Sequence, residues 1–218
     1  MAGKALFFVG VERKCGATMI SRSMAQFLAS ATRKQALWIS RTEENRIYGP
    51  EDLSGVCLRE AGLDYLEKAR WKGNMEAAKE RFSWICVDEG ALPRAMNACS
   101  ALRQTEKVIW VAEQSHRCLL RTEELLQRVK TEQDGSAEEG EIPKPDLLLI
   151  NRYRENDPFT LAYCRQRLAP WPWLPCLAVA DSQRGREAEW QDMTLLELRD
   201  RAFRRDISAV RKELEYEL

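Results

Sequence analysis

The sequence predicts an α/β fold, with one doubly wound domain over residues 1–218 and a mostly parallel sheet of six or more strands covered by helices on both faces. Three observations predict it. Short, nearly continuous apolar runs recur along the chain, longer amphipathic stretches separate them, and a glycine-containing turn joins the first run to the first amphipathic stretch. A chain of 218 residues is long enough to bury a core of its own.

Apolar runs that are short and uninterrupted are typical of parallel strands, because helices cover such strands on both faces. The expected strands are Ala5–Val9, Ala36–Ser40, Trp84–Val87, Val108–Ala112, Leu147–Ile150 and Pro175–Val179.

Amphipathic spacing predicts the helices between these strands. The first begins at or just after the glycine turn, with one apolar face made by Met19, Ile20, Met24, Phe27 and Leu28. Others are expected over 63–82, 115–130 and 196–218. The last is highly charged, but Phe203, Ile207 and Val210 share one side, which favours packing on the protein's own sheet. Residues 131–145 are polar and acidic, as in an exposed, mobile loop.

Composition limits the classes of function. Lys plus Arg and Asp plus Glu both number 34, so no net charge attracts nucleic acid or anionic lipid, and no specific nucleic-acid partner is expected. The apolar runs are too short to cross a bilayer, and no signal peptide is evident, so a cytoplasmic protein is predicted. Seven cysteines without a CxxC pair, together with a single histidine, predict small buried side chains rather than a zinc site or a disulfide framework.

The stretch "FFVGVERKCGATMIS" contains the candidate site. A strand that turns through glycine into a helix binds anions, because free N–H groups converge there and the helix dipole adds positive potential. The full phosphate-binding motif, GxxxxGK[ST], adds a lysine for the outer phosphates and a hydroxyl for Mg²⁺. Gly16 and Thr18 are present, whereas Ala17 takes the place of the lysine. The expected phosphate-binding residues are Arg13, Lys14, Cys15, Gly16, Ala17, Thr18 and Met19. If exposed, Cys15 would be reactive through a lowered pKa.

This strand, loop and helix resemble those of the MinD/ParA group of P-loop ATPases, whose loop runs KGGxGKT[TS]. "ERKCGATM" aligns with that loop without gaps. Glu12 then replaces the group's signature lysine, which crosses a dimer interface to the partner's nucleotide. Arg13 and Lys14 replace the two glycines.

The resemblance continues along the chain and implies ATP or ADP with Mg²⁺ as the cofactor. "FSWICVDEG" puts Asp88 at the position of the family's magnesium-linked aspartate, so Thr18 and Asp88 are the expected Mg²⁺ residues and Asp88 is the single catalytic candidate. "PKPDLLLINRYR" puts Asn151 where the family has an adenine-binding asparagine, with Arg152 beside it. The residues alone leave an alternative open for each of these roles. Asp88 could cap the helix that follows, Asn151 could be a turn residue that bonds its own backbone, and the loop could be a turn that binds nothing.

In relatives the second strand ends in a carboxylate that positions the attacking water, but here Ser40 and Arg41 follow, with Glu43 and Glu44 further on. With Ala17 and Glu12, this indicates a pseudo-ATPase. The resemblance implies a localisation or assembly factor, most like the TadZ/CpaE proteins of pilus assembly, with protein partners that include a second copy of itself. Two alternatives stay open: a slow ATPase or tyrosine-kinase-like enzyme of the same fold, and an interaction module with an empty pocket.

Overall fold

The computed structural model describes residues 3–32, 35–40, 57–58, 63–67, 75–92, 107–133, 142, 144–191 and 193–216. Three positions named for the end of the second strand (41, 43 and 44) lie outside these residues, as do 134–141 and 143 of the predicted acidic loop.

Within the described residues, one eight-stranded sheet forms the centre of the molecule, in the order β3-β4-β2-β5-β1-β6-β7-β8. All neighbouring strands in it run parallel except β3, which is antiparallel to β4. The strands are β1 (Lys4–Gly10), β2 (Ala36–Ser40), β3 (Cys57–Leu58), β4 (Leu63–Glu67), β5 (Trp84–Ala91), β6 (Lys107–Glu113), β7 (Leu147–Tyr153) and β8 (Cys176–Ala180).

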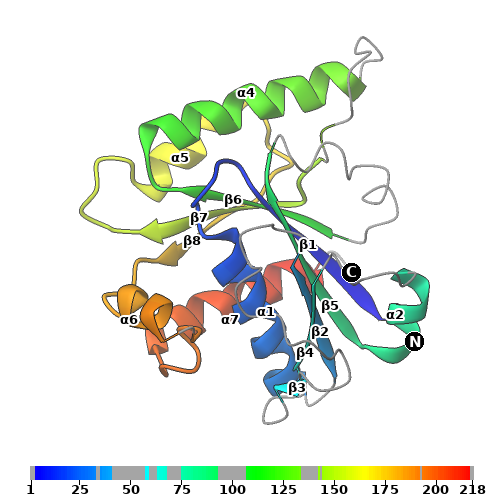
Figure 1. Cartoon of the computed structure of the whole chain (residues 1–218). Coiled ribbons are helices and arrows are strands. Elements are labelled where there is room, and N and C mark those ends of the chain that lie inside the picture. Colours follow the sequence, from blue (N-terminus) through cyan, green and yellow to red (C-terminus); the bar gives the residue numbers. More distant parts are fainter. Residues whose placement is uncertain are drawn as a thin grey trace.

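Helices cover both faces of the sheet, as the sequence predicts (Figure 1). Alternate residues of β1 show the two faces: Leu6 and Phe8 pack with α1 and α7, whereas Val9 packs with α4 and α5. The described helices are α1 (Ala17–Thr32), α2 (Met75–Arg81), α4 (His116–Gln133), α5 (Leu161–Arg167), α6 (Gly185–Trp190) and α7 (Arg201–Tyr216).

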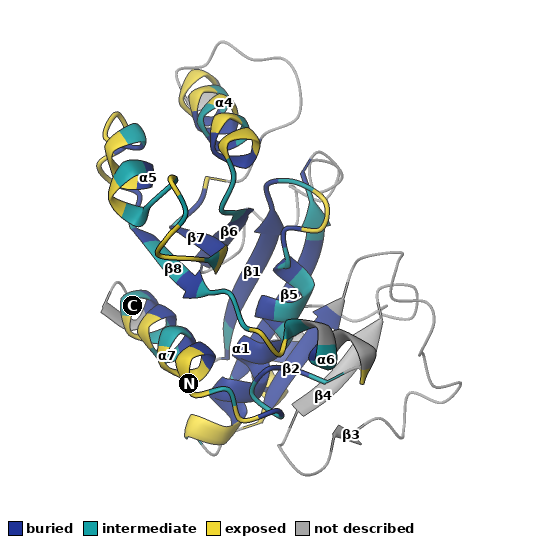
Figure 2. Ribbon diagram, turned by 90° about the vertical axis from the view of Figure 1, so that its left-hand side faces the viewer, coloured by how far each residue is buried: buried dark blue, intermediate teal, exposed yellow. Residues whose placement is uncertain are grey.

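The strands are buried along most of their length, whereas α4 and α7 expose their outer sides (Figure 2). All six predicted strands are present, with small differences at their ends. The predicted face of α1 is also confirmed, since Ile20, Met24, Phe27 and Leu28 are buried. The five cysteines whose side chains are described are buried, as predicted: Cys15, Cys86, Cys118, Cys164 and Cys176.

The helix predicted over 63–82 is wrong in its first part. Leu63–Glu67 form strand β4, which pairs in parallel with β2, whereas Met75–Arg81 form the helix α2 within the predicted range. Positions 68–74 of the prediction lie outside the described residues. Five residues of "LDYLE" satisfy a short strand as well as a helical turn, and the open edge of β2 decides between them by offering backbone partners.

The C-terminal helix begins later than predicted, at Arg201. Asp200 Oδ1 accepts a hydrogen bond from Phe203 N at 2.9 Å, as a helix-capping side chain does. The predicted packing of α7 on the protein's own sheet is confirmed, because Phe203, Ile207 and Val210 are fully buried beside α1 and β8.

Candidate functional site

The loop from Gly10 to Gly16 leaves the carboxyl end of β1 in the middle of the sheet. Backbone bonds fix its first residues: Val11 N donates to Val111 O at 2.9 Å, and Leu92 N donates to Gly10 O at 2.8 Å. Gly10 has no room for a side chain, because a Cβ there would lie 2.8 Å from Cys15 Sγ. The thiol of Cys15 therefore fills the space beneath the loop.

Cys15 is buried, contrary to the reactive alternative. The N–H groups of Ala17 and Glu12 face its sulfur and lower its pKa, but burial outweighs them and raises the pKa to about 11. The thiol therefore stays protonated at neutral pH, and its role is to support the loop from inside.

Two residues of the loop have positive φ angles. Gly16 has φ of 90° and Lys14 has φ of 64°. Lys14 therefore adopts a backbone conformation that favours glycine, at a cost of about 1 kcal/mol for a residue with a Cβ. The loop therefore holds two residues in the left-handed region, one of which has a Cβ.

Thr18 and Asp88 meet at the start of α1. Thr18 Oγ1 donates to Asp88 Oδ2 at 2.6 Å, and Gly90 N donates to Asp88 Oδ1 at 3.0 Å. Strand β5 continues to Ala91, so the alternative in which Asp88 caps a following helix is wrong. The two residues predicted to hold Mg²⁺ are therefore in direct contact.

Asp88 is fully buried, and desolvation raises its pKa to about 6 even though both hydrogen bonds lower it. No basic side chain among the described residues forms an ion pair with it. Its carboxylate is therefore a buried negative charge whose partners are two neutral donors.

Asn151 packs directly against the loop. Its Nδ2 donates to Cys15 O at 2.9 Å, and a Cβ on Gly16 would lie only 2.1 Å from the same nitrogen. Asn151 and Asp88 therefore both lie at the loop, as the prediction requires. The predicted base-binding residue Arg152 is exposed at the end of β7, where its Nη1 contacts Glu113 Oε1 at 3.3 Å.

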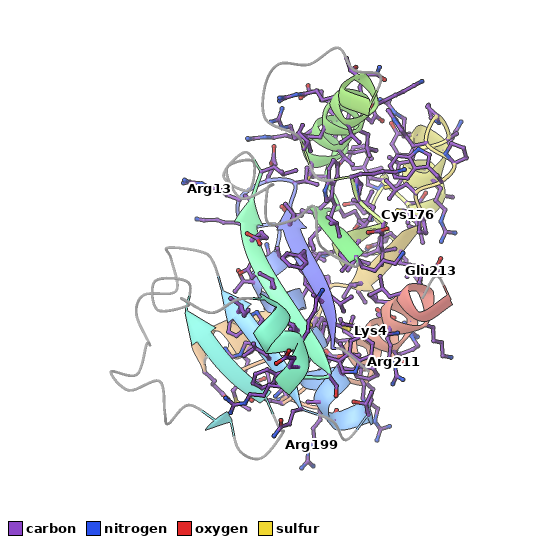
Figure 3. The ribbon with its side chains drawn as sticks, turned by 90° about the vertical axis from the view of Figure 1, so that its right-hand side faces the viewer. Lys4, Arg13, Cys176, Arg199, Arg211 and Glu213 are labelled. Atoms are coloured by element: carbon purple, nitrogen blue, oxygen red, sulfur yellow. The ribbon has the colours of Figure 1, made fainter. Side chains whose placement is uncertain are left out.

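Charged side chains form the rim of the loop. Arg13 and Lys14 are exposed, and Arg13 extends away from the sheet (Figure 3). Glu12 Oε1 accepts from Arg117 Nε at 3.1 Å, so the acid in the position of the signature lysine is paired within its own chain. Ala17, in the position of the other lysine, is 7% exposed.

Sequence reasoning missed two residues that build this edge. Gln114 Nε2 donates to the carbonyls of Arg154 and Phe159 at 3.0 Å, so it ties the segment after β7 to the start of α4. Arg117 reaches the loop over 105 positions of sequence. Neither belongs to a motif, so the sequence carries no signal for them.

A parallel sheet with a glycine turn after β1, a hydroxyl at the start of α1 and an aspartate on the neighbouring strand are features of the P-loop fold. The chain has the MinD/ParA variety of this fold. It is similar to the ParA family ATPase from Chlorobium tepidum, with a TM-score of 0.70 and 14% identity over 94% of this chain and 97% of that one.

Two MinD structures are also similar. A chain of the MinC:MinD cell division complex from Aquifex aeolicus matches with a TM-score of 0.68 and 13% identity, over 96% of this chain and 95% of that one. The septum site-determining protein MinD from Pyrococcus horikoshii, complexed with Mg-ADP, matches with a TM-score of 0.64 and 14% identity, over 94% and 93%. No family model matches the sequence, and no curated protein sequence is significantly similar to it.

Proposed function

We propose that this protein is a MinD/ParA-type nucleotide-binding protein that takes ATP or ADP with Mg²⁺ and hydrolyses ATP slowly or not at all. The observation that carries the proposal is the 2.6 Å hydrogen bond between Thr18 and Asp88, made where the glycine turn enters α1. It joins two oxygen-bearing side chains next to helix N–H groups that have no intrahelical acceptor. A similar structure, MinD from Pyrococcus horikoshii, is a complex with Mg-ADP.

The residues present suit magnesium. A hydroxyl and a carboxylate are the hard oxygen ligands that Mg²⁺ prefers. Asp88 is buried and forms no ion pair with a described basic residue, so a divalent cation would offset its desolvation. When bound, Mg²⁺ neutralises phosphate charge, while Thr18 and Asp88 hold and orient it and the loop N–H groups bind phosphate oxygens.

Slow hydrolysis follows from two replacements. Phosphoryl transfer depends on positioned positive charge, and one such contact lowers the barrier by about 2 to 4 kcal/mol. Ala17 cannot supply that charge, and Glu12 carries the opposite one. Binding depends more on backbone N–H groups, which these replacements leave in place.

In this proposal the nucleotide is a structural ligand that stabilises one conformation or a homodimer of a cytoplasmic localisation or assembly factor. The MinC:MinD complex is an example of a protein partner in a similar structure. Membership of the TadZ/CpaE type, and with it a role in pilus assembly, is the finer part of the proposal. None of the described helices has the length and apolar character needed to cross a bilayer.

Calorimetry with ATP and ADP, each with and without Mg²⁺, tests binding, and an assay of released phosphate tests hydrolysis. Binding without release supports the proposal. Binding with release supports the slow-enzyme alternative. If neither nucleotide binds, the remaining alternative is an interaction module with an empty pocket.

Restoring the lysine is a sharper test. Ala17→Lys should tighten ATP binding about tenfold, because a charged hydrogen bond to phosphate contributes about 1.5 kcal/mol. Ala17→Met is the matched control, since it adds comparable length without charge. If the two variants bind ATP equally well, the loop is not built around a triphosphate.

A further inference from the structure

The loop carries two cationic side chains, Arg13 and Lys14, and both are exposed at its rim. Ala17 is buried where a lysine would reach the phosphates, and Arg13 extends away from the sheet (Figure 3). No cation therefore stands at position 17 itself, and positive charge near a bound anion comes from backbone N–H groups, from the rim, and from Arg117 of α4, which contacts Glu12.

The start of α4 lies beside the loop (Figure 1). Gln114 N donates to Asn151 O at 3.3 Å, and the side chain of Asn151 donates to Cys15 O. Ser115 Oγ accepts from Cys118 N at 3.2 Å and so caps α4. The positive ends of the α1 and α4 dipoles thus flank the same asparagine.

Arg117 lies in the first turn of α4, where a cation is unfavourable because it opposes the helix dipole. That turn contains no acidic residue. The ion pair with Glu12 adds little to the stability of the fold, because the side chain of Arg117 is 85% exposed and such pairs contribute at most about 1 kcal/mol. Stability therefore does not explain why an arginine stands at this position.

Glu12 uses only one edge of the guanidinium. Its carboxylate accepts from Nε, and the terminal nitrogens of Arg117 have no hydrogen-bond partner among the described residues. A planar guanidinium with two free nitrogens is suited to bind two phosphate oxygens at once. The contact with Glu12 holds this group at the rim of the loop.

We propose that Arg117 is a phosphate-binding residue of this site: Glu12 positions it, and its terminal nitrogens bind the phosphates of a nucleotide held in the loop of the same chain. This inference rests on the proposed function. Arg117 supplies from α4 the positive charge that a lysine at position 17 would supply from the loop.

Calorimetry on the full chain tests the inference, with Mg-ADP and Mg-ATP as probes. Arg117→Gln should weaken both affinities about tenfold, as expected for one charged hydrogen-bonding group, and should lower their dependence on salt. Arg121→Gln is the matched control, because Arg121 lies one turn further along α4 and pairs with Glu124. It should bind as the unmodified protein does.

Further variants separate the roles. Glu12→Gln should bind at least as well as the unmodified protein, because its amide oxygen can still accept from Arg117 Nε while a negative charge near the phosphates is removed. If the unmodified protein binds nucleotide and Arg117→Gln binds it equally well, the inference is wrong and the proposed function stands. If the unmodified protein binds neither probe, both fail. Sedimentation at the titration concentrations identifies the chain that makes the contact. Weaker binding by monomers of Arg117→Gln supports a contact within the same chain, whereas weakening seen only with dimers would place the contact on a second copy and overturn the inference.

Discussion

Asp88 combines full burial with two neutral hydrogen-bond donors, Thr18 and Gly90. Its pKa of about 6 lies above the value of a carboxyl group in an unfolded chain. Between about pH 4 and pH 6 the folded state therefore keeps a proton that the unfolded state has lost, and stability falls as the pH rises through this range.

Replacing the carboxylate of Asp88 should remove this loss of stability at rising pH. Without Mg²⁺, Asp88→Asn should be more stable than the unmodified protein at pH 7.5 by roughly 2 to 3 kcal/mol, and its stability should fall less between pH 4 and pH 6. Urea unfolding across this pH range measures both effects. Glu124→Gln, which removes an exposed carboxylate of α4, is the control. An unchanged pH slope in Asp88→Asn would contradict the burial of a titrating group.

Gly16 and Asn151 form a second residue-scale constraint. Gly16→Ala should destabilise the protein by about 2 to 3 kcal/mol, because the added Cβ would meet Asn151 Nδ2 at 2.1 Å and φ is 90°. In an Asn151→Ala background the penalty should be about 1 kcal/mol smaller, since the clash is gone and only the backbone strain remains. Denaturant unfolding of the four proteins gives this coupling. Equal penalties in both backgrounds would show that the two residues do not touch.

At the scale of elements, α7 shows how a strongly charged sequence can still pack. Phe203, Ile207 and Val210 face α1 and β8, while Asp206 Oδ2 accepts from Ala180 N at 2.9 Å. The apolar spacing predicted this face. The cap at Asp200 bonds the residue three positions on and is a local signal, which the predicted start at residue 196 overlooks, whereas the bond to β8 depends on the fold.

Truncating α7 at its centre tests this packing. Ile207→Ala should lower the free energy of unfolding by about 2 to 4 kcal/mol, because Ile207 is 0% exposed. Arg204→Ala, on the exposed side of the same helix, should change it by less than about 0.5 kcal/mol. Similar small effects from both substitutions would mean that α7 does not pack on the sheet.

The first residues of the helix predicted over 63–82, which form strand β4 instead, illustrate the limit of periodicity. "LDYLE" has no period long enough to separate a helix from a strand, and β2 determines the outcome by pairing with it. The six predicted strands were easier to recognise, because burial on both faces makes each of them apolar throughout.

At the scale of the whole molecule, nucleotide binding should raise stability by mass action. At a hundredfold excess over its dissociation constant, Mg-ADP should add about 2.7 kcal/mol, which corresponds to a shift in Tm of roughly 5 to 10 °C for a chain of this size. Scanning calorimetry measures the shift. Chelating Mg²⁺ should remove most of it, and a shift that survives chelation would show that nucleotide binding does not depend on Mg²⁺.

The sequence by itself determined the alternation of buried strands and amphipathic helices, and the turn into α1 at Gly16, because these depend on local pattern. It also showed that Ala17 stands where the full phosphate-binding motif has a lysine. Only the tertiary structure decided that Thr18 meets Asp88, that Asn151 closes against Gly16 and that Arg117 reaches Glu12. These contacts join residues 70 to 136 positions apart, and the register of the sheet, which no local pattern encodes, brings them together.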